Sequence, residues 1–183
     1  MNSDFLETLK KSGVICRSAE QESTGCKSFV FILPAYLKKA ATIVDGEGYF
    51  LEDITCCQVS EGMELIYHFD HYHSPGRVSL RTLIDADKAE ISSIASIYPG
   101  AEWHERECTD FFGITFRGNP NPVPLLLSPR NPGPVLKKEE EKLKGMEDML
   151  PESLTVKSPD HNSGIEAVLA GWADQIRKDG GEK

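Results

Sequence analysis

Apolar residues along this chain follow two spacings, one typical of strands and the other of helices. Short runs rich in β-branched and aromatic residues, each bounded by turn residues, predict strands. They lie at residues 14–16, 29–33, 49–59, 65–69 and 78–84. Helical spacing and helix-start signals predict helices at residues 4–11, 35–44, 88–97 and 102–112. The last three strands follow one another across short turns, which favours antiparallel pairing.

These elements predict a two-layer α+β domain over residues 1–118, with helices packed on one face of an antiparallel sheet. The composition changes beyond this domain, because six of the 11 prolines fall between Pro120 and Pro134. Proline at this density predicts an extended tail, and we assign residues 119–160 to this proline-rich segment and a linker. Residues 161–183 are expected to form an amphipathic helix. Its apolar stripe consists of Ile165, Val168, Leu169, Trp172 and Ile176.

The segment from Trp103 to Phe116 places four charged residues beside aromatic side chains. Glu102 and Arg106 are four residues apart, as are Arg106 and Asp110, so a helix would bring opposite charges together on one face. Gly113 is suited to ending that helix in a left-handed conformation. Charged groups are costly to bury unless they are paired. The segment is therefore either an exposed helix with ordinary surface ion pairs or a docking surface that another protein covers.

The proline-rich segment contains three consecutive leucines, Leu125, Leu126 and Leu127. Burying a leucine side chain contributes about 1.5–3 kcal/mol, so a disordered linker has little reason to carry three of them. Either the segment packs back on its own domain, or it lies along the surface of a partner. Composition alone leaves both possibilities open.

Composition and charge narrow the class of protein. The chain has 183 residues, a net charge of −9, 39% hydrophobic residues and 27% charged residues, which suits one globular domain with a tail. An acidic chain argues against binding to nucleic acid or anionic membrane surfaces, because both need clustered basic residues. No apolar run approaches the roughly 20 residues that cross a bilayer, and the first residues lack a secretory pattern. We expect a cytoplasmic location without direct membrane insertion.

The cysteines predict free thiols rather than a disulfide framework. Their number is odd and their spacing irregular; they are Cys16, Cys26, Cys56, Cys57 and Cys108. No Cys-x-x-Cys pair is present, so we expect neither an iron–sulfur cluster nor a zinc ribbon in this chain. Cys56 and Cys57 are adjacent in a predicted strand and should face opposite ways, which disfavours a bond between them.

Three histidines, His68, His71 and His73, lie close enough in sequence to suggest a metal site. Alternation along a strand would turn His68 away from the other two, which argues against shared ligation. The chain also lacks a phosphate-binding glycine loop and a dinucleotide fingerprint. We therefore expect no flavin or nicotinamide to bind here.

A second candidate chemistry pairs Cys108 with His104, four residues away on the predicted helix, as a thiol nucleophile and its base. No third orienting group is evident in the sequence. Glu105 and Glu107 are two residues apart, and such neighbours diverge on a helix rather than meeting at a substrate. The residues alone thus leave a stand-alone cysteine- or metal-dependent enzyme as an alternative function.

The strongest signal is the pattern around the charged helix. Ala101-x-Trp103-x-Glu105-Arg106-Glu107-x-x-Asp110-x-Phe112-Gly113-Ile114-x-Phe116-x-Gly118-x-Pro120 resembles the signature of the 30 kDa subunit of respiratory complex I, an NADH dehydrogenase. The same type of protein occurs in energy-converting membrane hydrogenases. Tyr67-His68 and Arg77-Val78-Ser79-Leu80 resemble the family's central hairpin. Asn119 stands where the family usually has histidine, which favours a divergent branch such as the hydrogenase type.

This resemblance implies a cofactor-free structural or assembly subunit in the hydrophilic arm of a complex-I-like NADH:quinone oxidoreductase or a related NiFe hydrogenase. The parent complex would couple electron transfer to ion translocation. The implied partners are a large catalytic subunit and a small iron–sulfur subunit, which would carry the iron–sulfur clusters and, in a hydrogenase, the NiFe centre. The chain would be peripheral to the cytoplasmic membrane through these partners. A free adaptor of the same fold is a further alternative.

The resemblance implies a partner interface on the charged helix and the proline-rich segment, with no catalytic, cofactor-binding or metal residue. The expected interface residues are Trp103, Glu105, Arg106, Glu107, Asp110, Phe112, Gly113, Pro120, Leu125, Leu126, Leu127, Lys137 and Lys138.

Overall fold

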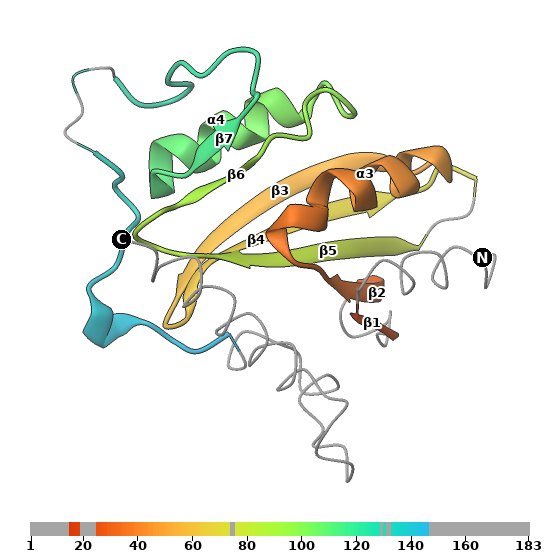
Figure 1. The fold of residues 1–183 in the computed structure, drawn as a ribbon, viewed down its shortest axis with the longest axis horizontal. Helices are drawn as coiled ribbons and strands as arrows, with labels where there is room; N and C mark the ends of the chain where they lie inside the picture. Colours follow the sequence, from red (N-terminus) through yellow and green to blue (C-terminus); the bar gives the residue numbers. More distant parts are fainter. Residues whose placement is uncertain (1–14, 19–24, 74–75, 129, 131–132, 147–183) are drawn as a thin grey trace, which may run out of the picture.

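The computed structural model describes residues 15–18, 25–73, 76–128, 130 and 133–146. The helices expected at residues 4–11 and 161–183 lie outside this part of the chain. The described elements are shown in Figure 1. In chain order they are β1 (Ile15–Ser18), β2 (Cys26–Phe31), η1 (Pro34–Tyr36), α3 (Leu37–Gly46), β3 (Phe50–Val59), β4 (Gly62–Asp70), β5 (Arg77–Ile84), β6 (Glu90–Ser92), α4 (Ala101–Phe112), β7 (Thr115–Arg117) and η2 (Glu140–Lys142).

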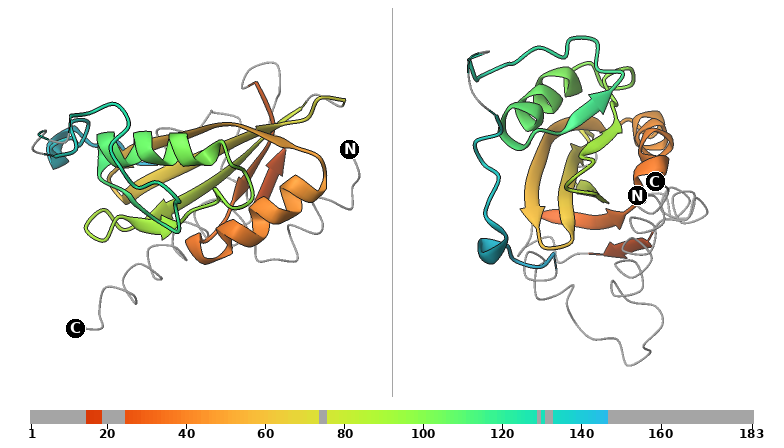
Figure 2. Two further views of the ribbon diagram at one scale, coloured as in Figure 1. Left: turned by 90° about the horizontal axis from the view of Figure 1, so that it is seen from above. Right: turned by 60° about the vertical axis from the view of Figure 1, so that its left-hand side comes forward.

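The larger sheet has five strands in the order β1-β2-β5-β4-β3. β3, β4 and β5 form the predicted antiparallel meander, and β1 pairs antiparallel with β2. The β2–β5 pairing is parallel, since α3 and two strands of the meander separate these neighbours in sequence. The twist of the sheet turns β1 and β2 well away from the direction of β3 and β4 (Figure 2). The α+β class is confirmed, with one parallel pairing in an otherwise antiparallel sheet.

The first face of the sheet, marked by Val30, Leu65, Tyr67 and Leu80, carries the main hydrophobic core. Alternation along the strands sends these side chains to the same side. Pro34 opens η1 directly ahead of α3, where proline is tolerated because the first turn of a helix needs no N–H donor. Both α-helices pack on this face: α3 contributes Leu37, Ala40, Ala41 and Val44, and α4 contributes Ala101 and Cys108.

The second face of the sheet is formed by Phe29, Phe31, Glu64, Arg81 and Leu83, which alternate with the core residues. Each of these side chains is at most 5% exposed. Arg81 Nε donates to Glu64 Oε1 at 2.7 Å. The guanidinium carbon lies 5.6 Å and 5.9 Å from the ring centroids of Phe29 and Phe31. Pairing and aromatic stacking together allow this guanidinium to be buried.

The helix predicted for residues 88–97 is wrong. Residues 90–92 instead form β6, which pairs in parallel with β7, so that Ile91 lies opposite Phe116. Asp85 Oδ1 accepts the N–H groups of the second and third residues after it, which closes a turn before β6. Ile91 and Ile94 are buried, so the spacing identified core positions but not their backbone conformation. No helix within the described ranges is long and apolar enough to cross a membrane.

Candidate functional site

α4 confirms the helix predicted over residues 102–112 and lies on β3 (Figure 1). It ends at Gly113, whose φ of 72° is left-handed and whose N–H donates to the carbonyl of Thr109 at 2.9 Å. A Cβ atom at Gly113 would lie 3.3 Å from Cγ of Pro134. Glycine therefore ends the helix and also leaves room for the chain that returns past it.

Arg106 joins α4 to the proline-rich segment. Its Nε donates to the carbonyl of Val123 at 2.8 Å, and its Nη2 donates to the carbonyl of Pro124 at 3.2 Å. Its Nη1 lies 3.4 Å from Glu102 Oε1, which confirms the ion pair expected from their spacing. A proline-rich segment has few N–H donors but keeps its carbonyls, so the several donors of a guanidinium suit it.

Asp110 holds the same segment through its amide groups. Its Oδ2 accepts the N–H groups of Leu125, Leu126 and Leu127 at 2.9, 2.7 and 3.0 Å. Burial alone would raise the pKa of Asp110, but the three N–H groups and the charge of Arg106 outweigh it and hold that pKa below its ordinary value. We call residues 119–127 the strip, and Arg106 with Asp110 the clasp. The strip therefore packs back on its own domain.

Two asparagines fasten the beginning of the strip. Asn119 Nδ2 donates to Glu105 Oε2 at 2.8 Å and to the carbonyl of Glu102 at 3.2 Å. Asn121 Nδ2 donates to Glu102 Oε1 at 3.0 Å. The side chains of α4 thus bind the strip at its start, middle and end.

Glu105 is fully buried, although it belongs to the interface expected from the resemblance. Its Oε1 accepts the N–H of Ile94 at 2.8 Å. Burial raises the pKa of this carboxyl, against the opposing effect of its hydrogen bonds from Ser93, Ile94 and Asn119. Direct contact between Glu105 and a partner does not agree with this placement, because the carboxylate is enclosed by its own chain. Asp110, at 9% exposed, is likewise directed inward.

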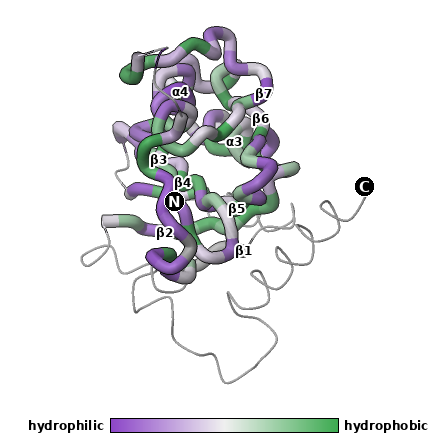
Figure 3. The backbone as a smooth tube through the Cα atoms, turned by 90° about the vertical axis from the view of Figure 1, so that its left-hand side faces the viewer, coloured by the Kyte–Doolittle hydropathy of each residue, from purple (hydrophilic) through white to green (hydrophobic). Residues whose placement is uncertain are grey.

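An apolar surface remains exposed around the clasp. Trp103, Val123 and Leu126 are 60%, 52% and 61% exposed. The Arg106 guanidinium lies 5.6 Å from the centre of the Trp103 ring, and the same group binds the carbonyl of Val123. Figure 3 shows green, hydrophobic stretches of the strip passing over α4 at the margin of the molecule. We call Trp103, Val123 and Leu126 the apolar surface; exposed apolar side chains grouped in this way are typical of protein-binding sites.

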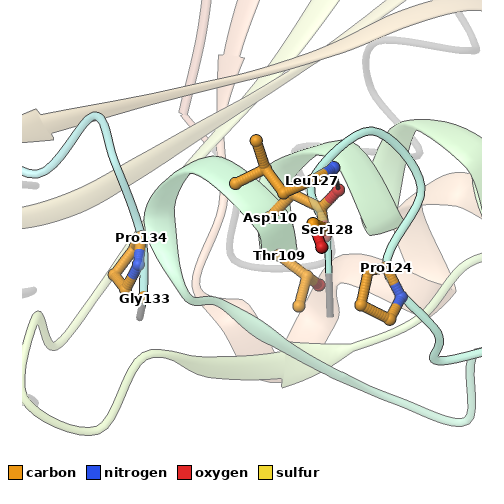
Figure 4. Close-up of a pocket in the computed structure, with 7 residues that line it drawn as sticks. All are labelled: Thr109, Asp110, Pro124, Leu127, Ser128, Gly133 and Pro134. Atoms are coloured by element: carbon orange, nitrogen blue, oxygen red, sulfur yellow. Dashed lines mark hydrogen bonds between the residues drawn. The ribbon is translucent and has the colours of Figure 1, made fainter. Parts of the chain in front are cut away.

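A small pocket of about 180 Å³ adjoins the clasp. In Figure 4, Pro124 and Pro134 lie on opposite sides of it, with Asp110 and Leu127 between them. Its remaining lining residues are Thr109, Ser128 and Gly133. Leu136 N–H donates to the carbonyl of Phe111 at 3.0 Å, which returns the chain to the end of α4. The pocket is therefore framed by the helix and by both passes of the proline-rich segment.

The other residues of the expected interface differ in exposure and position. Glu107, Gly113, Pro120, Lys137 and Lys138 are exposed, whereas Arg106, Phe112, Leu125 and Leu127 are partly exposed. The backbone N–H of Lys138 donates to Gln58 Oε1 on β3 at 2.7 Å. The two lysines therefore lie along β3, outside the group formed by α4 and the strip.

Cys56 on β3 and Cys108 on α4 form a disulfide, with their Cα atoms 6.1 Å apart. The expectation of free thiols is therefore wrong for this pair, while Cys57 keeps its thiol. The sequence separation is 52 residues, and only the docking of α4 on β3 brings the two together. With its sulfur bonded, Cys108 has no thiol to act as a nucleophile with His104, whose Nδ1 instead lies 3.2 Å from Asp53 Oδ1.

Reduction of this disulfide is expected to lower the free energy of unfolding by about 2–4 kcal/mol, because it releases a long loop in the unfolded chain. Urea denaturation with and without reductant measures the change. The variant Cys57→Ser, which alters a free thiol, should show the same dependence on reductant. Alkylation of both Cys56 and Cys108 in the native, unreduced chain would contradict the prediction.

Two of the three candidate metal-binding histidines contact each other, and His68 has a different partner. His68 Nδ1 lies 2.9 Å from Ser79 Oγ, on the second face of the sheet. The His71 ring lies 5.3 Å from the Tyr49 ring, and its Nδ1 accepts the N–H of His73 at 3.1 Å. Among the described residues, no group of three or more His, Cys, Asp or Glu side chains converges as a metal site would require.

Proteins similar in sequence to this chain are named as subunits of oxidoreductases. The chain is 38% identical over 80 residues to the C/D subunit of the NADH-quinone oxidoreductase of Shewanella woodyi, covering 44% of this chain and 13% of that protein. It is 37% identical over 65 residues to the C subunit of the F(420)H(2) dehydrogenase of Methanosarcina mazei, covering 36% of this chain and 41% of that protein. The chain thus spans less than half the length of these relatives.

Solved structures share the fold. A trypsin-resistant fragment of Nqo5 aligns with a TM-score of 0.55 and 20% identity, over 63% of this chain and 95% of the fragment. A chain of the membrane-bound sulfane sulfur reductase, an archaeal respiratory membrane complex, aligns with a TM-score of 0.60 and 22% identity. The alignment covers 71% of this chain and 78% of that chain. The family model for the respiratory-chain NADH dehydrogenase 30 Kd subunit matches residues 30–144. Since this match covers more than half of the sequence and includes the clasp and the strip, the chain belongs to the family of that 30 Kd subunit.

Proposed function

We propose that this chain is a non-catalytic subunit of a membrane-associated redox complex, in which it braces the large catalytic subunit against a neighbouring iron–sulfur subunit. The family membership supports the type of complex. The observation that supports the binding role is the apolar surface, which remains exposed while the polar groups beside it are satisfied within the chain. The partner would cover Trp103, Val123 and Leu126.

The contrast between buried carboxylates and exposed apolar side chains at the site favours this role. Asp110 and Glu105 face inward and fix the strip and its surroundings, so they contribute to binding through shape rather than through contact. Covering apolar area contributes roughly 25 cal/mol per Å². A few large anchors surrounded by polar groups account for most of the binding energy in many interfaces. Trp103 and Leu126 are the anchors that the geometry offers, with Arg106 and Glu102 on their polar side.

The redox chemistry would belong to the partners. They would hold the iron–sulfur clusters and, in a hydrogenase-type complex, a NiFe centre, and the complex would couple electron transfer to ion translocation. The two relatives described above are named for different donors, NADH and F(420)H(2). The complex would lie at the cytoplasmic membrane, with this chain on its cytoplasmic side and peripheral to the membrane.

The double variant Trp103→Ala, Leu126→Ala is expected to weaken association with partner subunits by about 30-fold or more, since two anchors at a desolvated centre are worth at least about 2 kcal/mol. A tagged chain is expressed at its native level in its source organism and purified from those cells. The subunits that co-purify with it, and the iron that they contain, are then quantified. The matched control is Tyr72→Ala, because Tyr72 is 77% exposed but lies at the β4–β5 connection.

The wild type and the Tyr72→Ala variant should retain the iron-containing subunits, and the double variant should lose them while melting at an unchanged temperature. The proposal fails if the wild-type chain purifies without redox subunits. It also fails if the isolated chain itself turns over a substrate.

A further inference from the structure

The second face of the sheet is buried, although neither described helix lies on it. Phe29, Phe31 and Leu83 are 5%, 1% and 2% exposed. They are absent from the core cluster that contains the buried residues of α3 and α4. Something other than these helices therefore excludes water from this face.

The polar groups on the second face are also shielded from water. Glu64 is 0% exposed and Arg81 is 4% exposed, and their ion pair lies beside two phenylalanine rings. On the same face, Ser79 Oγ lies 3.2 Å from Cys26 Sγ. Glu64 and Arg81 satisfy each other within the sheet, so a segment that covers them beside the two rings can do so with apolar side chains.

The described chain ends at the β3–β4 turn, at one end of the sheet. Met146 is fully buried, and its N–H donates to the carboxylate of Glu61 in the β3–β4 turn at 3.0 Å. Ser60 N–H donates to the carbonyl of Lys144 at 3.0 Å. The chain is thus fixed to one end of the β3–β4 hairpin where residues 147–183 begin.

The sequence after Met146 contains one segment of suitable chemistry. Residues 163–176 begin with a capping box and carry apolar residues at helical spacing, namely Ile165, Val168, Leu169, Trp172 and Ile176. A helix of this length measures about 21 Å, comparable with the roughly 27 Å of an eight-residue strand. The 16 residues between Met146 and this segment can extend to about 50 Å, which is enough to reach any point on the face.

We propose that residues 163–176 form a helix whose apolar stripe docks on the second face of the sheet, over Phe31 and Leu83. The sheet is then enclosed on both faces by its own chain. The surface left for partners is the side that carries α4 and the strip. The N-terminal residues 1–14 and a separate subunit are the competing occupants, and the experiment distinguishes them.

The test places the photo-reactive residue p-benzoylphenylalanine in the full-length chain, in place of Leu169. Irradiation of the dilute, partner-free chain should cross-link position 169 within the same molecule to peptides from β2 or β5. The matched control carries the same residue in place of Ala167, which would lie on the opposite side of the helix. Its cross-links to these strands should be several-fold fewer.

A second measurement uses fluorescence. Trp103→Phe leaves Trp172 as the single tryptophan, and acrylamide should quench it several-fold less in the native chain than in urea. Native quenching equal to that in urea overturns the proposal, as do cross-links from position 169 that go to residues 1–14, to a second copy or equally from both positions. Because no partner is present, these outcomes are independent of the proposed subunit function.

Discussion

Replacing Glu64 with glutamine is expected to lower the free energy of unfolding by about 3–5 kcal/mol. The substitution keeps the shape of the side chain but removes the negative charge that pairs with Arg81 at 2.7 Å. The guanidinium would then remain in an apolar environment, beside Phe29 and Phe31, without a counter-charge. Equilibrium denaturation in urea, followed by far-UV circular dichroism, measures the loss.

Two further variants sharpen this prediction. Glu47→Gln removes an exposed carboxylate and should change stability by less than about 0.5 kcal/mol. The double variant Glu64→Met, Arg81→Met replaces the ion pair by apolar side chains and should recover most of the lost stability. Equal effects of Glu64→Gln and Glu47→Gln would show that the second face is open to water.

Replacing Asp110 with alanine is expected to release the end of the strip at a cost of about 2–4 kcal/mol in local stability. Its carboxylate is the shared acceptor for three backbone N–H groups, and bonds to charged groups are worth about 1.5–3 kcal/mol each when measured singly. Hydrogen exchange of Leu125, Leu126 and Leu127 should accelerate by roughly 30-fold or more. The amount of partner subunits that co-purify with the Asp110→Ala chain should also decrease.

Glu107→Ala, on the same helix but exposed, is the control and should leave exchange of the strip unchanged. Acid titration checks the same bonds. The folded-state pKa of Asp110 lies below that of an exposed aspartate, so its stabilising contribution is complete above the unfolded-state pKa and is lost as the pH falls through the folded-state pKa. Protection of the three leucine amides should decline only in that acidic range in the wild type. Protection that is lost between pH 5 and 7 would contradict the assignment.

Local rules predicted much of this fold. The alternation in β3, β4 and β5 and the helical spacing in α4 depend on contacts between near neighbours, and Gly113 ended the helix as expected. The segment at 88–97 shows the limit of such rules. Its apolar residues were placed in the core correctly, but pairing with β7, more than twenty residues later, decided that the backbone would be extended.

The candidate site was less predictable, because its decisive contacts are distant in sequence. Glu105 was expected at the partner interface, yet it is enclosed by Ile94 and Asn119. A signal for its burial was present: Ala101, Glu105 and Cys108 follow helical spacing, and all three are buried. The partner of Cys108 could not be found in this way, since Cys56 lies 52 residues earlier on a different element.

The clasp has a consequence for the kinetics of assembly. A segment that is free in solution must lose conformational entropy when it docks, which costs about 1–2 kcal/mol for each residue fixed. Arg106 and Asp110 hold the strip in place before any encounter, so a docking protein would meet a preorganised template. Association should then proceed close to rigid-body rates, and weakening the clasp would slow complex formation even where the final contacts are unchanged.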